Sequence, residues 1–162
     1  MKFLVISDTH GKIEAAIEAF KSLKGIDQIL HLGDYARDGS QLENRLGVPV
    51  ITVRGNMDGS YSNEDYRIIR TEFGKIYLSH GHMEAVKYST HNLLYKAYSL
   101  GCKAALYGHT QLPMYENVGG IYLLNPGSLT MPKGGKAGSY GVIQTEQDLF
   151  KATIFYRDDR RK

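Results

Sequence analysis

Side chains that can donate an oxygen or nitrogen atom to a metal ion follow five short apolar runs in this sequence. They are, in chain order, Asp8 with His10, Asp34, Asn56, His80, and His109 with Gln111. Carboxylate and amide oxygens and imidazole nitrogens all coordinate divalent transition metals, and the set contains no thiolate. Each residue alone has a simpler explanation, because Asp and Asn favour turns and helix starts and a single His is often structural. Their repetition favours a metal centre for Mn²⁺, Fe, Zn²⁺ or Ni²⁺ over a structural zinc site.

The elements that must position these side chains are short strands and amphipathic helices. Apolar runs predict strands at Lys2–Ser7, Asp27–Leu32, Val48–Val53, Tyr66–Thr71, Lys75–Ser79, Ala104–Tyr107, Met114–Val118, Ile121–Leu124, Tyr140–Thr145 and Leu149–Tyr156. Helical spacing of apolar residues predicts helices within residues 12–24, at Ser40–Leu46 and at Thr90–Leu100. The early alternation of strand and helix predicts a parallel sheet, and ligands bind beyond the carboxyl ends of such strands.

The second half of the chain reads mostly as strands. The predicted fold is therefore α/β, a four-layer α/β/β/α sandwich in which two mixed sheets pack together between helices. With 162 residues, the chain is expected to form a single domain over residues 1–162.

Composition and charge exclude several other classes of protein. Hydrophobic residues make up 42% and charged residues 23%, as in ordinary globular proteins. The net charge of +3 is partly carried by the tail RDDRRK at residues 157–162, where two Asp interrupt the basic run. Nucleic acid is therefore expected only as a substrate. The single Cys102 excludes an intramolecular disulfide, and no run approaches membrane-spanning length. A cytoplasmic protein without a membrane partner is expected.

The oligomeric state stays open at this stage. Three tyrosines, Tyr88, Tyr95 and Tyr98, recur around the predicted helix at Thr90–Leu100. They could form a face between two copies of the chain, or they could simply cover the helix, which is the ordinary expectation.

The ordered pattern DxH, GD, GNxD, HGH, GH resembles the calcineurin-like metallophosphoesterases. The phrases VRGNMD, LSHGH, YGHTQLP and LNPGSLTMPKGG resemble the small bacterial and archaeal branch, the YfcE-type phosphodiesterases. The resemblance runs from Phe3 to about Val142. It implies the metallophosphoesterase fold, which agrees with the fold predicted above, and a metal-dependent phosphodiesterase that acts on a small phosphate diester.

The resemblance also implies a role for each matching position. Two divalent metals, most simply Mn²⁺, would share Asp34 as a bridging carboxylate and activate a bridging water or hydroxide as nucleophile. The first metal would take Asp8 and His10, and the second Asn56, His80 and His109. Asp58 would orient a ligand such as His10, while Asn56 and His82 would contact the substrate.

Two positions depart from the family pattern. Where GHTH usually supplies a second His, this sequence has Gln111, which would bind the first metal weakly or through a water. Where larger members carry a His that serves the leaving group, this sequence has Met57, which cannot donate a proton. These departures predict a loosely held first metal, and activity that depends either on a good leaving group or on another acid.

Gln111 also keeps a second function open, that of a protein-binding scaffold with a degraded metal site. The retromer complex contains a subunit of this kind. Against this reading, six of the seven expected ligand positions are intact. Nucleic-acid binding through the basic tail is a third and weaker hypothesis, which would require strongly salt-dependent affinity.

Overall fold

A computed structural model of the chain describes residues 1–59, 64–130, 132 and 137–157. The last five residues of the basic tail, Met131 and residues 133–135 of the LNPGSLTMPKGG phrase, and residue 136 after it lie outside the described part.

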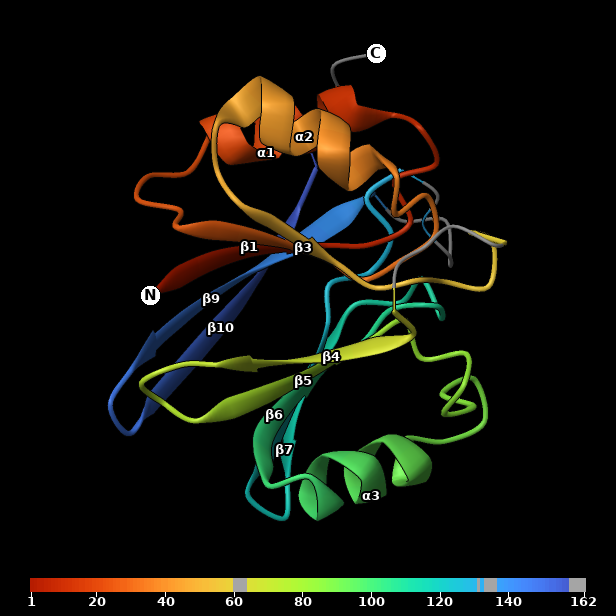
Figure 1. The fold of residues 1–162 in the computed structure, drawn as a ribbon, viewed down its shortest axis with the longest axis vertical. Coiled ribbons are helices and arrows are strands. Elements are labelled where there is room, and N and C mark those ends of the chain that lie inside the picture. Colours follow the sequence, from red (N-terminus) through yellow and green to blue (C-terminus); the bar gives the residue numbers. More distant parts are fainter. Residues whose placement is uncertain (60–63, 131, 133–136, 158–162) are drawn as a thin grey trace.

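Two five-stranded sheets pack face to face, and helices cover their outer faces (Figure 1). The strand order is β10-β9-β1-β2-β3 in the first sheet and β4-β5-β6-β8-β7 in the second. The strands are β1 (Lys2–Ile6), β2 (Gln28–His31), β3 (Val50–Thr52), β4 (Tyr66–Arg70), β5 (Lys75–Ser79), β6 (Cys102–Leu106), β7 (Met114–Val118), β8 (Ile121–Asn125), β9 (Ser139–Glu146) and β10 (Leu149–Tyr156). The helices are α1 (Ile13–Lys21), α2 (Asp38–Leu46) and α3 (His91–Ser99). The predicted four-layer α/β sandwich is confirmed.

Alternation along the strands explains the layers. In β1, Phe3 and Val5 join a core between the two sheets, whereas Leu4 and Ile6 face the helices α1 and α2. A third cluster packs α3 against the outer face of the second sheet through Leu93 and Ala97. Because successive side chains of a strand point to opposite faces, a run that is apolar throughout must be covered on both sides.

The parallel strands bring their carboxyl ends together. β1, β2 and β3 run parallel, and so do β5, β6 and β8 in the other sheet. The parallel pairing of β6 with β8 was not foreseen in the strand-rich second half. It arises because β7 forms an antiparallel hairpin with β8 at the sheet edge and leaves the other side of β8 to β6.

Two element boundaries differ usefully from the prediction. Helix α2 begins at Asp38, two residues before the predicted Ser40, after a turn in which the Asp38 N–H donates to the Tyr35 carbonyl at 2.8 Å. Strand β3 is limited to Val50–Thr52, because Pro49 has no N–H with which to start the ladder. No helix among the described residues is long and apolar enough to cross a membrane.

Candidate metal centre

Each predicted ligand lies in the loop that directly follows a strand. Five of the seven adopt a left-handed backbone, with φ of 57° at Asp8, 51° at His10, 57° at Asp34, 69° at His109 and 62° at Gln111. Residues with a Cβ rarely adopt this conformation, which costs on the order of 1 kcal/mol or more each. Such strain persists where surrounding contacts fix the loop, and it is common at functional sites.

A buried cluster of ligand atoms lies where the two sheets meet at this end. Asp8, Asp34 and His80 each offer a ligand atom within 4.8 Å of the others, and all three residues are buried. Two loops of the first sheet supply the carboxylates, whereas the loop after β5 in the second sheet supplies His80. The cluster therefore depends on both sheets.

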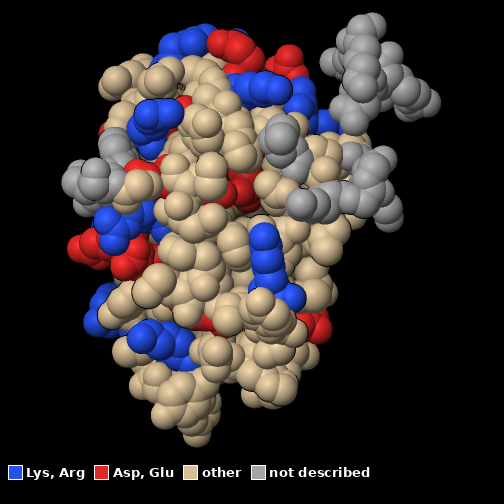
Figure 2. Space-filling model, turned by 90° about the vertical axis from the view of Figure 1, so that its right-hand side faces the viewer, with Lys and Arg blue, Asp and Glu red and all other residues tan. Residues whose placement is uncertain are grey.

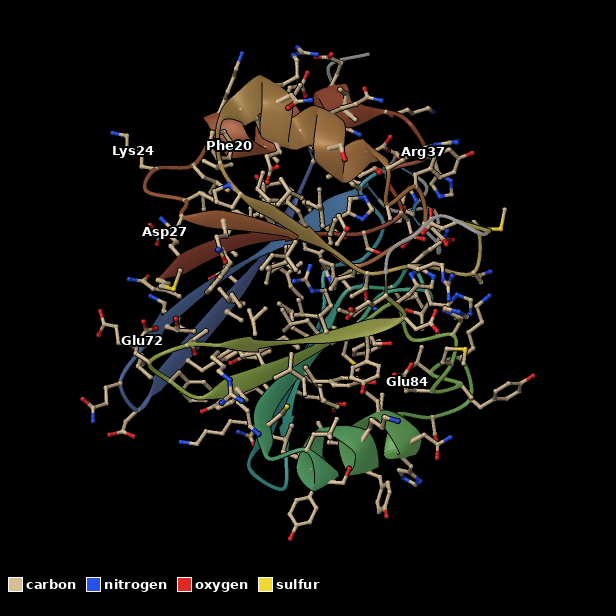
Figure 3. All side chains as sticks on the ribbon, in the orientation of Figure 1. Phe20, Lys24, Asp27, Arg37, Glu72 and Glu84 are labelled. Atoms are coloured by element: carbon tan, nitrogen blue, oxygen red, sulfur yellow. The ribbon has the colours of Figure 1, made fainter. Side chains whose placement is uncertain are left out.

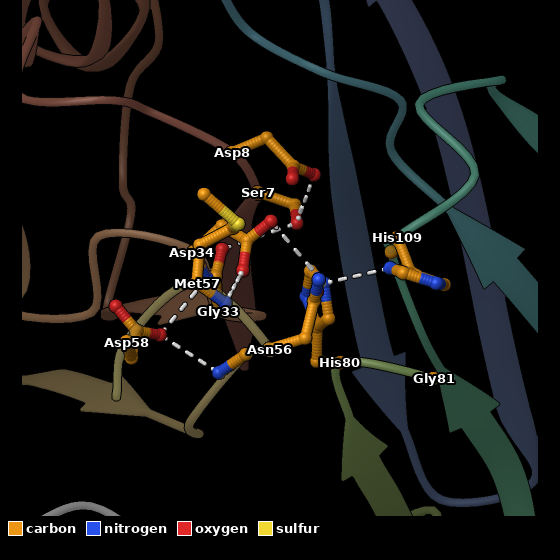
Figure 4. A network of polar contacts seen from close by, with 12 residues as sticks. Ser7, Asp8, Gly33, Asp34, Asn56, Met57, Asp58, His80, Gly81 and His109 are labelled. Carbon is orange, nitrogen blue, oxygen red and sulfur yellow. Dashed lines mark hydrogen bonds and ion pairs between the residues drawn. The ribbon is translucent and has the colours of Figure 1, made fainter. Parts of the chain in front are cut away.

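Around His80, three further groups converge on one ring nitrogen (Figure 4). The Nδ1 of His80 lies 2.7 Å from the Leu32 carbonyl oxygen, which can only accept, so Nδ1 carries a proton. The Nε2 lies 3.0 Å from Asn56 Oδ1, 3.2 Å from His109 Nδ1 and 3.4 Å from Asp34 Oδ2. In a neutral ring, that Nε2 lone pair would face two oxygen acceptors. A proton or a metal cation between these atoms removes the conflict.

The pKa values of the cluster reflect this crowding of charge. Burial raises the pKa of the Asp8 carboxyl to about 7, although the charge of His80 and a hydrogen bond from Ser7 oppose the shift. Burial also disfavours the ionised form of Asp34, but His80 outweighs it and holds the pKa of Asp34 below its usual range. For His80, burial is likewise outweighed by the hydrogen bond and charge of Asp34, which raise its pKa. The centre is built to hold positive charge.

Two predicted ligands carry buried polar atoms that have no hydrogen-bond partner among the residues that the structure describes. They are Asp8 Oδ1 and His10 Nε2, and His82 Nδ1 shares this property. Buried polar atoms are nearly always paired, because an unpaired one costs about 1–3 kcal/mol. Atoms of this kind beside a cluster of carboxylates fit the coordination of divalent cations, which supply the missing partner. The residues present therefore fit a metal centre.

Three residues of the predicted set, His10, His82 and Gln111, lie at the edge of the cluster around His80. The His10 ring lies 5.1 Å from the Tyr35 ring, measured between centroids. The His82 ring lies 5.4 Å from that of His80 and 6.1 Å from that of His109, so His82 adjoins the cluster. Gln111 is half-buried, and no hydrogen bond within the described residues holds its side chain.

Asp58 acts on a different ligand from the one suggested by the sequence. Its carboxylate accepts hydrogen bonds from three backbone N–H groups, those of Asp34 at 3.0 Å, Ala36 at 2.9 Å and Gly55 at 2.7 Å. Among the described residues, no hydrogen bond joins Asp58 to His10. Asp58 thus ties the loop after β2, including the backbone of Asp34, to the loop after β3.

Close approach of these two loops also explains a glycine. A Cβ placed on Gly55 would collide with the backbone nitrogen and the carboxylate of Asp34. The Met57 N–H donates a hydrogen bond to Asp34 Oδ1 at 2.9 Å, so the loop that carries Asn56 also contacts the Asp34 carboxylate.

The NPGS segment secures two other ligand loops. Asn125 Nδ2 donates to the Gly108 carbonyl at 3.2 Å and to Thr110 Oγ1 at 2.8 Å, on either side of His109. Ser128 Oγ donates to the Asp8 carbonyl at 3.3 Å. These bonds hold the loops of His109 and Asp8 against the NPGS turn.

Several buried polar residues near the centre were not singled out from the sequence. Glu84 accepts hydrogen bonds from the hydroxyls of Tyr77 and Ser79, at 2.6 and 2.8 Å, beneath the loop of His80. His31, Thr9 and Asp38 form a second buried group behind the loop of Asp8. Thr9 lies inside the DxH pattern, and His31 ends the strand before Asp34. Their closeness to these motifs was the one sequence feature that could have pointed to them.

The surface at this end of the molecule shows acidic groups at a hollow, as expected above the buried carboxylates of the cluster. Acidic atoms are visible in a hollow near the middle of the face, with Lys and Arg side chains around them (Figure 2). Arg37 and Glu84 lie toward this end, whereas Lys24, Asp27 and Glu72 lie toward the opposite one (Figure 3).

Comparison with known proteins identifies the class. The family described as the calcineurin-like phosphoesterase superfamily domain matches residues 1–148. The chain therefore belongs to the calcineurin-like phosphoesterase superfamily, whose members use divalent metals. Within it, the similarity is to the small YfcE/YsnB-type branch.

Two curated relatives place the chain in that branch. The probable metallophosphoesterase YsnB of Bacillus subtilis is 31% identical over 161 residues, which cover 98% of this chain and 91% of YsnB. The phosphodiesterase YfcE of Escherichia coli is 30% identical over 172 residues, covering 90% of this chain and 89% of YfcE. The solved YfcE structure aligns with a TM-score of 0.68 at 26% identity, covering 89% of this chain and 88% of that one.

A second solved structure shares the fold. Vps29 of Entamoeba histolytica, crystallised with Zn²⁺, aligns with a TM-score of 0.83 over 98% of this chain and 94% of its own. At 23% identity, this likeness shows the fold alone.

Proposed function

We propose that this chain is a phosphodiesterase that hydrolyses small phosphate diesters at a centre of two divalent cations, with Mn²⁺ preferred. The observation that supports it most is the convergence of Asp34, Asn56 and His109 on the Nε2 of His80. The unpaired buried atoms of Asp8 and His10 supply a second group of donors beside the first.

The ligands divide into two groups that share one carboxylate. Asp8 and His10 would hold the first cation, with Gln111 a weak ligand or one that acts through a water. Asn56, His80 and His109 would hold the second, and Asp34 would bridge both. When bound, two such cations make water a stronger nucleophile and neutralise charge on the phosphate.

The chain's own residues then bind and orient the diester. Only two of the ligands in this proposal are anionic, so the occupied centre keeps a positive charge that attracts a phosphate ester. The Asn56 amide and His82 are proposed to contact the substrate. Burial lowers the pKa of His82, which keeps its ring neutral at pH 7 and able to hydrogen-bond a phosphate oxygen.

Met57 limits the range of substrates. Its thioether cannot protonate a departing alkoxide. The proposed enzyme therefore favours diesters whose leaving group is stable as an anion, such as aryl esters.

Hydrolysis of bis(4-nitrophenyl) phosphate tests the proposal. Protein freed of metal with a chelator is assayed alone and with Mn²⁺, Fe²⁺, Zn²⁺ or Ni²⁺, beside the variants His80→Ala and His91→Ala. His91 is exposed at the start of α3 and serves as a matched control. Turnover should require the metal, should persist in His91→Ala, and should fall at least about a hundredfold in His80→Ala, or ~2.7 kcal/mol of transition-state stabilisation.

The opposite result would favour the scaffold hypothesis. If folded wild-type protein hydrolyses the diester with none of the four metals, the enzymatic proposal is wrong. The fold would then serve another purpose, with Gln111 marking a site that no longer turns over substrate.

A further inference from the structure

A continuous chain of buried hydrogen bonds lies behind the loop of Asp8 and His10. The Gly33 N–H donates to His31 Nδ1 at 3.1 Å, so the other ring nitrogen of neutral His31 carries the proton. That Nε2 donates to Thr9 Oγ1 at 2.9 Å, and the Thr9 hydroxyl in turn donates to Asp38 Oδ2 at 2.5 Å. The Gly11 N–H donates to the same carboxylate oxygen at 2.9 Å.

This chain links the two loops that carry the predicted ligands of the first cation. Thr9 and Gly11 flank His10, and Thr9 also follows Asp8. At the other end of the chain, Gly33 precedes the bridging Asp34. Each bond therefore involves Thr9, Gly11 or Gly33, which are all sequence neighbours of predicted ligands, while no hydrogen bond joins Asp38 to a ligand side chain among the described residues.

The loops need such support because their ligands are strained. Asp8, His10 and Asp34 all have left-handed φ angles between 51° and 57°. Without contacts that fix the loops, these residues would relax to ordinary conformations and their side chains would turn away. Asp38 holds the N–H and the hydroxyl on the two sides of His10 with a single oxygen.

The burial of Asp38 is costly and calls for a reason. The residue is 2% exposed, and within the described part of the chain it forms no ion pair. Its place in the first turn of α2 gives only modest compensation from the helix dipole. A buried carboxylate without a cationic partner is destabilising, so mere fold stability is a poor explanation for it.

We propose that Asp38 is a positioning residue that sets the affinity of the first cation, acting through Thr9, Gly11 and His31. The second cation would share Asp34 with the first, but its other ligands, Asn56, His80 and His109, lie on loops that this chain of hydrogen bonds does not touch. The inference rests on the metal-binding part of the proposed function and does not depend on diester hydrolysis.

Titration with Mn²⁺ tests the inference directly. Free Mn²⁺ is measured by electron paramagnetic resonance as it is added to metal-free protein, which gives the number and affinity of bound ions. In Asp38→Ala, one of the two ions should bind about tenfold or more weakly, as is typical when support of a metal ligand is lost. The other ion should keep its wild-type affinity. Asp38→Asn can keep an oxygen acceptor in place and should restore most of the lost affinity.

Two further variants separate positioning from general destabilisation. Thr9→Val keeps the side-chain volume but removes the hydroxyl between His31 and Asp38, so it should weaken the same ion. Leu42→Ala leaves a cavity beneath the same helix, α2, without touching the chain. It should lower stability while leaving both Mn²⁺ affinities unchanged.

Several outcomes would overturn the inference. Wild-type affinity for both ions in Asp38→Ala and Thr9→Val would do so, as would equal weakening of both ions, or the same selective loss in Leu42→Ala. If wild-type protein binds two Mn²⁺ ions but hydrolyses no diester, the proposed enzymatic function fails while the effect of Asp38 on the first ion is still measured.

Discussion

Gln111 and His109 leave the same strand end with similar left-handed φ angles, 62° and 69°. The loop thus gives Gln111 the strained backbone that it gives a predicted metal ligand, although an amide is a weaker ligand than imidazole for transition metals. A His at position 111 would start from the same backbone conformation as Gln111 and would offer a stronger ligand for a transition metal.

Replacing this residue measures that difference. Gln111→His should lower the Mn²⁺ concentration needed for half-maximal hydrolysis by about tenfold, or ~1.4 kcal/mol of binding free energy. Gln111→Ala provides the matched loss. If all three proteins require the same Mn²⁺ concentration, position 111 lies outside the metal environment.

His31 provides a pH-dependent contribution to stability. Burial lowers its pKa to about 4, against about 6.5 for an unfolded His. Between these pH values His31 is protonated in the unfolded chain but not in the folded one. The free energy of unfolding therefore decreases as pH falls from 6.5 to 4, by up to about 3 kcal/mol. The raised pKa of Asp8 acts in the opposite direction between pH 4 and 7.

Comparison with a variant isolates this effect. In urea unfolding of metal-free protein at pH 7, 6 and 5, the wild type should lose stability relative to His31→Gln as the pH is lowered. A difference between the two proteins that does not change with pH would show that His31 is protonated alike in the folded and unfolded states.

At the scale of elements, Glu84 joins strand β5 to the loop that carries His80 and His82. It is 7% exposed and binds two hydroxyls from β5, those of Tyr77 and Ser79. The Ser79 hydroxyl also accepts a hydrogen bond from the Gly81 N–H at 3.1 Å, so the contact extends into the turn beyond His80.

Removing this carboxylate should destabilise the fold. Glu84→Ala leaves two buried hydroxyls without their acceptor and should lower the free energy of unfolding by about 1–3 kcal/mol in urea denaturation. Glu72, at the opposite end of the molecule, forms an exposed ion pair with the amino terminus. Glu72→Ala should leave the midpoint unchanged, and equal midpoints for the two variants would contradict the anchoring role of Glu84.

The strands, and the place of the candidate ligands directly after them, were predictable because they depend on local patterns. The apolar run of β1 and the Asp that follows it are adjacent in sequence, and strand ends of a parallel sheet meet by topology. The partners of the ligand loops were harder to foresee. Asp38 lies 29 residues from the Thr9 that it binds, and Asp58 lies 24 residues from Asp34. Such pairings are set by how α2 and the loops pack, which no periodicity encodes.

At the scale of the whole molecule, metal binding and fold stability should be coupled. Any cation that binds only the folded chain stabilises it by about 2.7 kcal/mol at a hundred times its Kd. For a protein of this size, that corresponds to a rise of about 5–10 °C in melting temperature. Mn²⁺ should therefore raise the melting temperature above that in EDTA, as followed by differential scanning fluorimetry.

The same measurement on variants locates the coupling. His91→Ala should retain the Mn²⁺-dependent rise, whereas His80→Ala should lose much of it. A rise that survives intact in His80→Ala would mean that the stabilising ion binds elsewhere. The assignment of residues 1–162 to one domain remains a prediction, although the two sheets that supply the centre share a continuous core.

The position of β1 inside its sheet has a consequence for synthesis. β1 is paired on one side by β2 and on the other by β9, whose residues are made more than a hundred positions later. The carbonyl of Asp8 likewise accepts hydrogen bonds from the hydroxyls of Ser128 and Thr130, which are also synthesised late. A nascent chain on the ribosome therefore carries its first ligands early but cannot secure them until residues 139–146 have emerged. A metal ion at the proposed centre would therefore be held only after residues 139–146 have been synthesised.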